Sequence, residues 1–224
     1  MRKLIEAVIF DLDGVIVSTD ENHYRAWKRL ADDEGIFFDR KINERLRGVG
    51  RMGCLEIIME KATRVYTIDE KAELTDRKNN YYRESLDGLS AEDVLPGVME
   101  WLNCLKQRKI PIAIGSSSKN TNYILSKMEL SDYFNAVVGG GDVTKSKPDP
   151  EIFLLAAEKL NKKPGNCLVV EDAVSGLEAG ISAGMKVLAV GYAQSDNRAD
   201  LAMADLSKMS CGEAIDHINT KTNK

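Results

Sequence analysis

The sequence has few cysteines among its 224 residues, and none of them are paired at metal-binding spacing. The four cysteines are Cys54, Cys104, Cys167 and Cys211. They lie far apart and form no CxxC motif, which disfavours both a disulfide framework and a zinc site. Scattered reduced thiols are typical of a cytosolic protein, so we expect a cytoplasmic localisation.

Long apolar runs and an excess of one charge are also missing. No run approaches the length of a membrane span, and the apolar stretch that ends at Asp11 is too short and too charged for a signal peptide. The 31 basic residues against 35 acidic ones give a net charge of -4, which argues against nucleic-acid and membrane partners. An anionic substrate must therefore be held by a local cluster of cations.

Short apolar runs, each followed by polar or glycine-rich residues, predict the strands of a parallel sheet. The runs are residues 7–10, 110–114, 136–138, 167–170 and 186–190. Apolar residues recur at helical spacing between them, as at Trp101 and Leu105, so strand and helix alternate. This alternation predicts an α/β fold with a doubly wound, Rossmann-like parallel sheet. Gly176, Gly180 and Gly184 recur every four residues and predict a helix face that packs closely on a strand.

Residues 18–91 interrupt this alternation and contain no convincing strand pattern. Thr19 or Asp20 can cap a first helix, and further helical stretches are expected through residues 56–64 and 70–83. We therefore predict a helical cap domain over residues 18–91, inserted after the first strand, and a core domain of residues 1–17 and 92–224. The polar last dozen residues are expected to fray.

Carboxylates follow two of the predicted strands. Asp11 and Asp13 come after the first strand, and Glu171 and Asp172 come after the strand at 167–170. Because the carboxyl ends of parallel strands meet at one edge of the sheet, these groups should converge. An oxygen-rich site of this kind suits Mg²⁺.

Groups that suit a phosphate follow the strand at 110–114. They are Ser116, Ser117, Ser118, Lys119 and Asn120, with Lys147 later, before Pro148. Hydroxyls, backbone amides near a helix start and a lysine bind phosphate well. Each motif alone has a simpler interpretation, as a turn, a helix cap or a solvated lysine. Their joint occurrence in this order instead predicts phosphoryl transfer on a carboxylate.

The same order of motifs resembles the haloacid dehalogenase superfamily over almost the whole chain. The matching positions are Asp11-Leu12-Asp13-Gly14, Ser116, Lys147 and Glu171-Asp172. The resemblance implies that Asp11 is the nucleophile and Asp13 the general acid/base, and that Ser116 and Lys147 hold the transferring phosphate. It also implies that Mg²⁺ is bound by Asp11, the backbone carbonyl of Asp13, Glu171 and Asp172.

The predicted cap is similar to that of the β-phosphoglucomutase branch of this superfamily. The resemblance implies substrate binding by His23, Trp27, Gly48, Val49, Arg51, Lys78, Ser117, Ser118, Lys119 and Asn120. In that branch, the arginine matched by Arg51 holds the phosphate that is not reacting. The sequence departs from the pattern at Met52, Gly53 and Cys54, where acidic residues and a serine are usual, and this affects sugar recognition.

The resemblance implies a monomeric isomerase that interconverts β-glucose 1-phosphate and glucose 6-phosphate, with Mg²⁺ and glucose 1,6-bisphosphate. The alternative is a sugar-phosphate phosphatase with the same core. A nucleotide-binding protein is disfavoured, because Thr144 stands where a dinucleotide-binding loop at Gly139 would need its third glycine, and there is no Walker lysine motif. A catalytically inactive regulatory domain is disfavoured because all the core motif residues are present.

Overall fold

A computed structural model describes residues 4–46 and 49–221. The chain divides into two compact units, one of Met1–Ser18 and Leu89–Lys224 and the other of Thr19–Gly88. These are unit 1 and unit 2, respectively. Within the described ranges, no helix combines the length and the apolar character that a membrane span needs.

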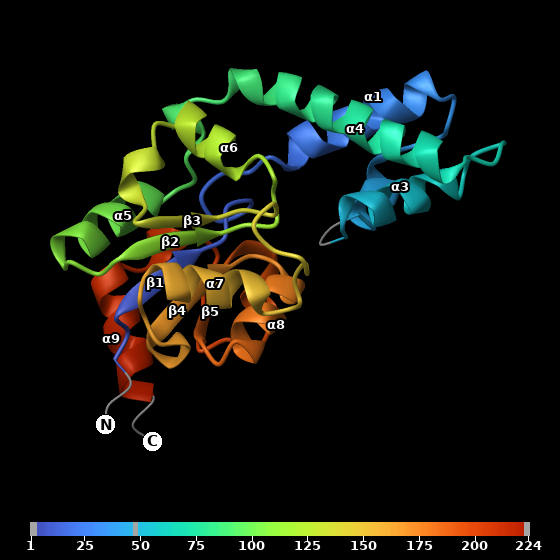
Figure 1. The fold of residues 1–224 in the computed structure, drawn as a ribbon. Helices are drawn as coiled ribbons and strands as arrows, with labels where there is room; N and C mark the ends of the chain where they lie inside the picture. Colours follow the sequence, from blue (N-terminus) through green and yellow to red (C-terminus); the bar gives the residue numbers. More distant parts are fainter. Residues whose placement is uncertain (1–3, 47–48, 222–224) are drawn as a thin grey trace. The chain divides into compact units, whose positions relative to one another are not determined.

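Unit 1 is built on a six-stranded sheet with the order β3-β2-β1-β4-β5-β6. The strands are β1 (Ala7–Phe10), β2 (Ile112–Gly115), β3 (Ala136–Val138), β4 (Cys167–Glu171), β5 (Lys186–Ala189) and β6 (Leu201–Ala202). All neighbouring strands are parallel, and β1 pairs with β2 and β4 on its two sides (Figure 1). The strand order therefore reverses between β1 and β4, and a doubly wound sheet places its site beyond the strand ends at this point.

Helices cover both faces of this sheet. They are α5 (Val98–Gln107), α6 (Thr121–Lys127), α7 (Glu151–Lys159), α8 (Val174–Ser182) and α9 (Cys211–Lys221). Every side chain of β1 is buried although successive side chains point to opposite faces, so neither face is open to water. Ala7 and Ile9 share a core cluster with Phe153 of α7 and Leu177 of α8. The predicted doubly wound α/β fold is confirmed.

The glycine spacing in α8 was only partly predictive. A Cβ at Gly180 would lie 2.7 Å from a methyl of Val187, so this position does pack closely on the sheet. Gly184 lies beyond the end of the helix with φ +72° and no neighbour within 4 Å of a built Cβ, so its predicted packing role is wrong. Its positive φ is typical of glycine after a helix end.

Unit 2 is helical, as the sequence predicts for an insert after the first strand. Its helices are α1 (Asp20–Asp33), α2 (Arg40–Glu44), α3 (Arg51–Met59) and α4 (Ile68–Ser85), followed by a short 3-10 turn at Leu86–Gly88. Trp27 and Leu30 of α1, Leu55 of α3 and Leu74 of α4 meet in one buried cluster. The amphipathic faces of these helices therefore supply a core for unit 2.

Three local predictions differ from the structure. The helix expected at 56–64 is α3, which begins at Arg51 and ends at Met59, because its buried side chains Cys54, Leu55 and Ile58 belong to this earlier segment. Thr19 is the N-cap of α1, but its hydroxyl pairs with that of Tyr82 at 2.9 Å and does not cap the helix. The C-terminal segment does not fray over its described length, since α9 buries Ile215 and Ile218.

Candidate active site

Asp11 lies directly beyond β1, at the point where the strand order reverses. Its backbone amide donates to the carbonyl of Val170 on β4 at 2.9 Å, so the pairing of the two strands continues to this residue. The residue is only 7% exposed. The half-buried Asp13 follows, and a turn comes directly after it. The Gly14 amide donates to the carbonyl of Val17 at 2.7 Å in this turn. The pairing with β4 and the turn together hold the Asp11 backbone at the end of β1.

Lys147 connects the carboxylates of two strands. Its Nζ donates to Oδ1 of Asp11 at 2.6 Å and to Oε1 of Glu171 at 2.5 Å. The side chains of these residues are 7%, 10% and 1% exposed for Lys147, Asp11 and Glu171, so this is a buried, charge-assisted network. The ring of Phe153 lies below the ammonium, with its centroid 4.7 Å from Nζ.

The charges in this network do not balance, because two carboxylates surround a single ammonium group. Burial by itself would lower the pKa of Lys147, but the charges and hydrogen bonds of Asp11 and Glu171 outweigh burial and raise that pKa above its usual range. Burial raises the pKa of Glu171, and the charge of Asp11 raises it further. Two buried carboxylates thus share one ammonium, and a further cation would be stabilised there.

Three carboxylates at this edge of the sheet fit a divalent cation. Asp11, Glu171 and Asp172 each place one oxygen within 4.8 Å of the others. Two glycines make room for these carboxylates: a Cβ at Gly14 would lie 2.1 Å from Oδ2 of Asp172, and one at Gly176 would lie 1.8 Å from Oε1 of Glu171. An all-oxygen donor set of this kind fits Mg²⁺. For Asp13, the predicted contribution is its backbone carbonyl.

The segment 116–120 follows β2 and is stabilised by its own polar groups. The hydroxyl of Ser116 accepts from the Ser118 amide at 3.1 Å, and that of Ser118 accepts from the Asn120 amide at 3.1 Å. Ser116 and Asn120 are buried, whereas Ser117 and Lys119 are exposed. The carbonyl of Ser118 also accepts from the Gly140 amide at 2.9 Å, so the segment is fixed against the loop after β3.

Unit 2 brings together three of its predicted site residues, His23, Trp27 and Lys78. Nζ of Lys78 lies 2.8 Å from Nδ1 of His23 and 4.8 Å from the ring centroids of Trp27 and Tyr82. An ammonium can only donate, so Nδ1 accepts and neutral His23 carries its proton on Nε2. Burial lowers the pKa of His23 well below its usual value, and the charges of Lys78 and Arg51 lower it further.

Arg51 begins α3, and its guanidinium donates to Oδ1 of Asn79 at 2.9 Å. Burial lowers the pKa of Arg51, an effect that Asp76 opposes. Val49 is 39% exposed, and Gly48, also predicted to bind substrate, lies outside the described residues. Arg51 is thus held within unit 2 by α4.

Cys54, which stands where a serine is usual, forms hydrogen bonds within unit 2. Its thiol donates to the carbonyls of Val49 at 3.2 Å and Leu46 at 3.6 Å. Burial raises the pKa of Cys54 to about 11, so the thiol stays protonated at neutral pH. The departure from the pattern therefore fixes the end of the segment before α3.

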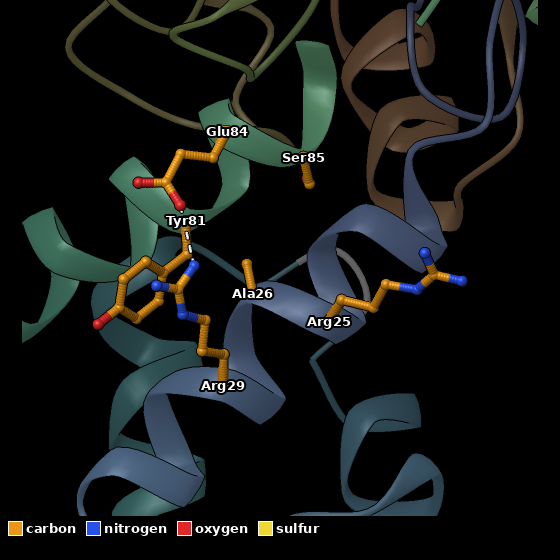
Figure 2. A pocket seen from close by; sticks show the side chains of 6 residues that line it. All are labelled: Arg25, Ala26, Arg29, Tyr81, Glu84 and Ser85. Atoms are coloured by element: carbon orange, nitrogen blue, oxygen red, sulfur yellow. Dashed lines mark hydrogen bonds and ion pairs between the residues drawn. The ribbon is translucent and has the colours of Figure 1, made fainter. Parts of the chain in front are cut away.

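A surface cavity of about 280 Å³ on α1 and α4 contains none of the predicted site residues. It is lined by Arg25, Ala26, Arg29, Tyr81, Glu84 and Ser85 (Figure 2). Arg29 donates to Glu84 at 2.9 Å and lies over the ring of Tyr81, and Arg25 is paired with Glu21 at 3.1 Å. Both guanidiniums are paired with carboxylates.

Sequence reasoning missed the roles of several residues that support the predicted ones. Gly14 and Gly176 make room for carboxylates, Tyr82 stacks on His23 with centroids 4.0 Å apart, and Glu151 binds the loop that carries Lys147. The glycine next to Asp13 was a usable signal, because a glycine in a tight turn often has a positive φ. Contacts such as Tyr82 with His23 join distant segments, and no local pattern indicates them.

Comparisons with known proteins agree on one family. The model of the haloacid dehalogenase-like hydrolases matches residues 5–184. A β-phosphoglucomutase of Bacillus subtilis is 44% identical over 208 residues, which are 92% of each chain. A phosphorylated carbohydrates phosphatase of Thermotoga maritima is 34% identical over 87% of this chain and 89% of its own. The crystal structure of a β-phosphoglucomutase from Clostridium difficile superimposes with a TM-score of 0.90 at 37% identity, over 99% of this chain and all of the other.

Proposed function

Because the chain belongs to the haloacid dehalogenase-like hydrolase family, we propose that it is an isomerase that interconverts β-glucose 1-phosphate and glucose 6-phosphate. The observation that carries the proposal is the 44% identity to a β-phosphoglucomutase over 92% of both chains. The match to a second β-phosphoglucomutase at a TM-score of 0.90 supports it. Sugar phosphates are small anions, which agrees with a local cation beside carboxylates in a chain of net charge -4.

In this proposal Asp11 is the nucleophile that becomes phosphorylated. A carboxylate and a phosphate dianion repel each other, and the ammonium of Lys147, 2.6 Å from Oδ1 of Asp11, offsets this repulsion. Lys147 and the buried Ser116 hold the transferring phosphate close to the nucleophile, so the attack is in effect intramolecular. The covalent intermediate divides one difficult transfer into two easier ones.

Asp13 is the proposed general acid/base. When phosphorylated Asp11 transfers its phosphate to β-glucose 1-phosphate, Asp13 takes the proton of the incoming hydroxyl, and the bisphosphate forms. When the bisphosphate then phosphorylates Asp11 through its other phosphate, Asp13 gives a proton to the leaving sugar oxygen, and glucose 6-phosphate is released. Glucose 1,6-bisphosphate is the proposed intermediate between the two half-reactions. The bisphosphate has two ends, and the second phosphate is the proposed ligand of Arg51, Ser118, Lys119 and Asn120, with His23, Trp27, Val49 and Lys78 as further substrate-binding residues.

Asp11, Glu171, Asp172 and the carbonyl of Asp13 are the proposed ligands of Mg²⁺. When bound, the ion supplies positive charge that stabilises the phosphate oxygens during transfer. Glu171 also holds Lys147 at 2.5 Å, so the same carboxylate would bind the cation and orient the ammonium. Oε1 accepts from Lys147 and Oε2 from the amide of Ala173 at 2.9 Å, and each carboxylate oxygen has a second lone pair that can bind a cation.

A sugar-phosphate phosphatase is the second candidate, and the 34% identity to a phosphorylated carbohydrates phosphatase favours it. The two reactions share the phosphorylation of Asp11 and differ in the acceptor, which is a sugar hydroxyl in one and water in the other. The test is to incubate the purified protein with β-glucose 1-phosphate and Mg²⁺, with and without glucose 1,6-bisphosphate. Glucose 6-phosphate that forms faster with the bisphosphate supports the isomerase. Stoichiometric release of inorganic phosphate without glucose 6-phosphate supports the phosphatase.

A further inference from the structure

Lys147 depends on a loop for its position, unlike the other core residues of the candidate site. Asp11 and Ser116 directly follow strands, and Glu171 is the last residue of β4. Lys147 comes nine residues after β3 ends at Val138, in the segment that leads to α7. Its ammonium nevertheless lies within 2.6 Å of two carboxylates. Something other than a strand must therefore hold this loop.

The carboxylate of Glu151 holds the loop through both of its oxygens. Oε1 accepts from the Thr144 amide at 3.0 Å and its hydroxyl at 3.2 Å, while Oε2 accepts from the Lys145 amide at 2.8 Å and the Thr144 hydroxyl at 3.0 Å. The two amides belong to the residues three and two positions before Lys147. Hydrogen bonds to the Thr144 and Lys145 amides lower the pKa of Glu151, so the carboxylate is charged at neutral pH.

Glu151 is a rigid anchor because it is the first residue of α7. Its own amide donates to Oδ1 of Asp149 at 3.0 Å, and the next two residues, Ile152 and Phe153, are buried in the core of unit 1. Phe153 is also the residue whose ring lies 4.7 Å from the Lys147 ammonium. The first turn of α7 therefore contacts the loop through Glu151 and the end of the lysine through Phe153.

We propose that Glu151 is a positioning residue for Lys147, which it holds in place by binding the backbone of Thr144 and Lys145. The carboxylate touches neither Asp11 nor the transferring phosphate. Its contribution is geometric: it reduces the freedom of the loop, so that the ammonium is already aligned when substrate binds. This inference rests on the proposed function for the role of Lys147 in phosphoryl transfer.

The test combines kinetics with a direct probe of Lys147. Glu151→Ala removes the four hydrogen bonds, and Glu151→Gln keeps one acceptor oxygen if the alanine variant folds poorly. Glu158→Ala is the control, because it removes the same side chain from an exposed position of the same helix. The first readout is the rate at which acetyl phosphate with Mg²⁺ phosphorylates Asp11. The second is acetylation of Lys147 by acetic anhydride, measured by mass spectrometry relative to the exposed Lys208.

We expect Glu151→Ala to slow phosphorylation roughly 10- to 100-fold, as misplacement of a catalytic group by about 1 Å can do. Lys147, with 7% of its side chain exposed, should become several times more reactive toward acetylation. In a Lys147→Ala background, Glu151→Ala should have little further effect, because residues that act through one group are not additive. Glu158→Ala should match the wild type in each measurement.

Two results would overturn the inference. One is an equal loss of rate from Glu151→Ala with and without Lys147, which would indicate a general effect on the fold. The other is unchanged acetylation of Lys147. If Lys147→Ala itself leaves phosphorylation of Asp11 intact, the proposed role of the lysine in phosphoryl transfer is wrong. Acetylation of Lys147 in Glu151→Ala then still decides whether Glu151 positions the lysine.

Discussion

At the scale of single residues, burial and neighbouring charge determine what each group can do. Lys147 is held as an ammonium between Asp11 and Glu171, whereas His23 is held neutral by burial beside Lys78. Burial lowers the pKa of both nitrogen bases. At Lys147 the two carboxylates outweigh burial and raise the pKa, whereas at His23 the neighbouring cations lower it further.

Asp11→Asn should abolish the phosphoenzyme. An amide is a poor nucleophile, and the substitution also removes one charge from the proposed metal site. Intact-protein mass spectrometry after incubation with acetyl phosphate and Mg²⁺ should show an added phosphate on the wild type and none on the variant. Phosphate on the variant's peptide around this position, or unimpaired turnover, would contradict the assignment of the nucleophile.

His23 should make the folded protein lose stability as the pH falls below about 6.5, the usual pKa of histidine. In that range the unfolded chain takes up a proton that the folded protein, whose His23 pKa is lowered, does not, so unfolding becomes more favourable. The effect is at most about 1.4 kcal/mol per pH unit for one proton.

Urea denaturation at pH 7.5 and pH 5.5 measures this effect. His23→Gln should reduce the difference in unfolding free energy between the two pH values by roughly 1.4 kcal/mol, because glutamine does not titrate. His217→Gln, at the exposed second histidine in α9, serves as the control and should leave that difference as in the wild type. Equal pH dependence in the wild type and His23→Gln would show that His23 is not held neutral.

At the scale of elements, the start of α8 holds the Glu171 carboxylate in place. The Ala173 amide donates to Oε2, and the missing side chain of Gly176 leaves room for Oε1, which would lie 1.8 Å from a Cβ. The helix thereby places Glu171 against Lys147. A glycine inside a helix lowers its stability by up to about 1 kcal/mol relative to alanine. Gly176 therefore makes the helix less stable and in return leaves room for the Glu171 carboxylate.

Gly176→Ala should therefore displace Glu171 and lower turnover by as much as about 10²-fold. It should also raise the Mg²⁺ concentration needed for half-maximal activity, since Glu171 is a proposed ligand. Gly212→Ala in α9 is the matched control, because a Cβ there would meet only the end of the flexible Arg108 side chain, at 3.1 Å. Magnesium titrations and melting curves on both variants provide the measurement. Wild-type turnover in a folded Gly176→Ala protein would show that the start of α8 does not position Glu171 for catalysis.

At the scale of the whole molecule, a substitution of Arg51 distinguishes the isomerase proposal from the phosphatase proposal. We propose that its guanidinium binds the phosphate that is not reacting, a group that acetyl phosphate lacks. Arg51→Ala should therefore cripple interconversion of the glucose phosphates and leave phosphorylation of Asp11 by acetyl phosphate mostly intact.

Arg45→Ala is the control for this experiment, because it removes a half-exposed arginine of unit 2 that is paired with Glu60. It should leave both reactions at wild-type rates. If both activities of Arg51→Ala decline in parallel while the melting temperature is unchanged, Arg51 does not serve a second phosphate, and the phosphatase becomes the better proposal. A lowered melting temperature would indicate a folding role.

The sequence alone predicted the strands β1 and β3 to the residue, and β2, β4 and β5 to within two residues at each end. Buried strands of a parallel sheet are local apolar runs with polar ends, and this pattern needs no knowledge of distant contacts. The two-residue strand β6 was missed because Leu201–Ala202 is too short to form such a run. The start of α3 was missed because Gly53, in its first turn, disfavours a helix.

The sequence by itself determined the fold class, the family and the kinds of group that the site contains, since each depends on short motifs in a fixed order. Only the tertiary structure decided which of these groups touch. Lys147 and Asp11 are 136 residues apart in the chain and 2.6 Å apart in space, and Tyr82 stacks on His23 of another helix. Glu151 and Gly176 gained their roles over shorter separations, from the path of a loop and the start of a helix. Such contacts arise from the register of parallel strands, the packing of helices on them and, in unit 2, the packing of helices on one another, which no local pattern of residues contains.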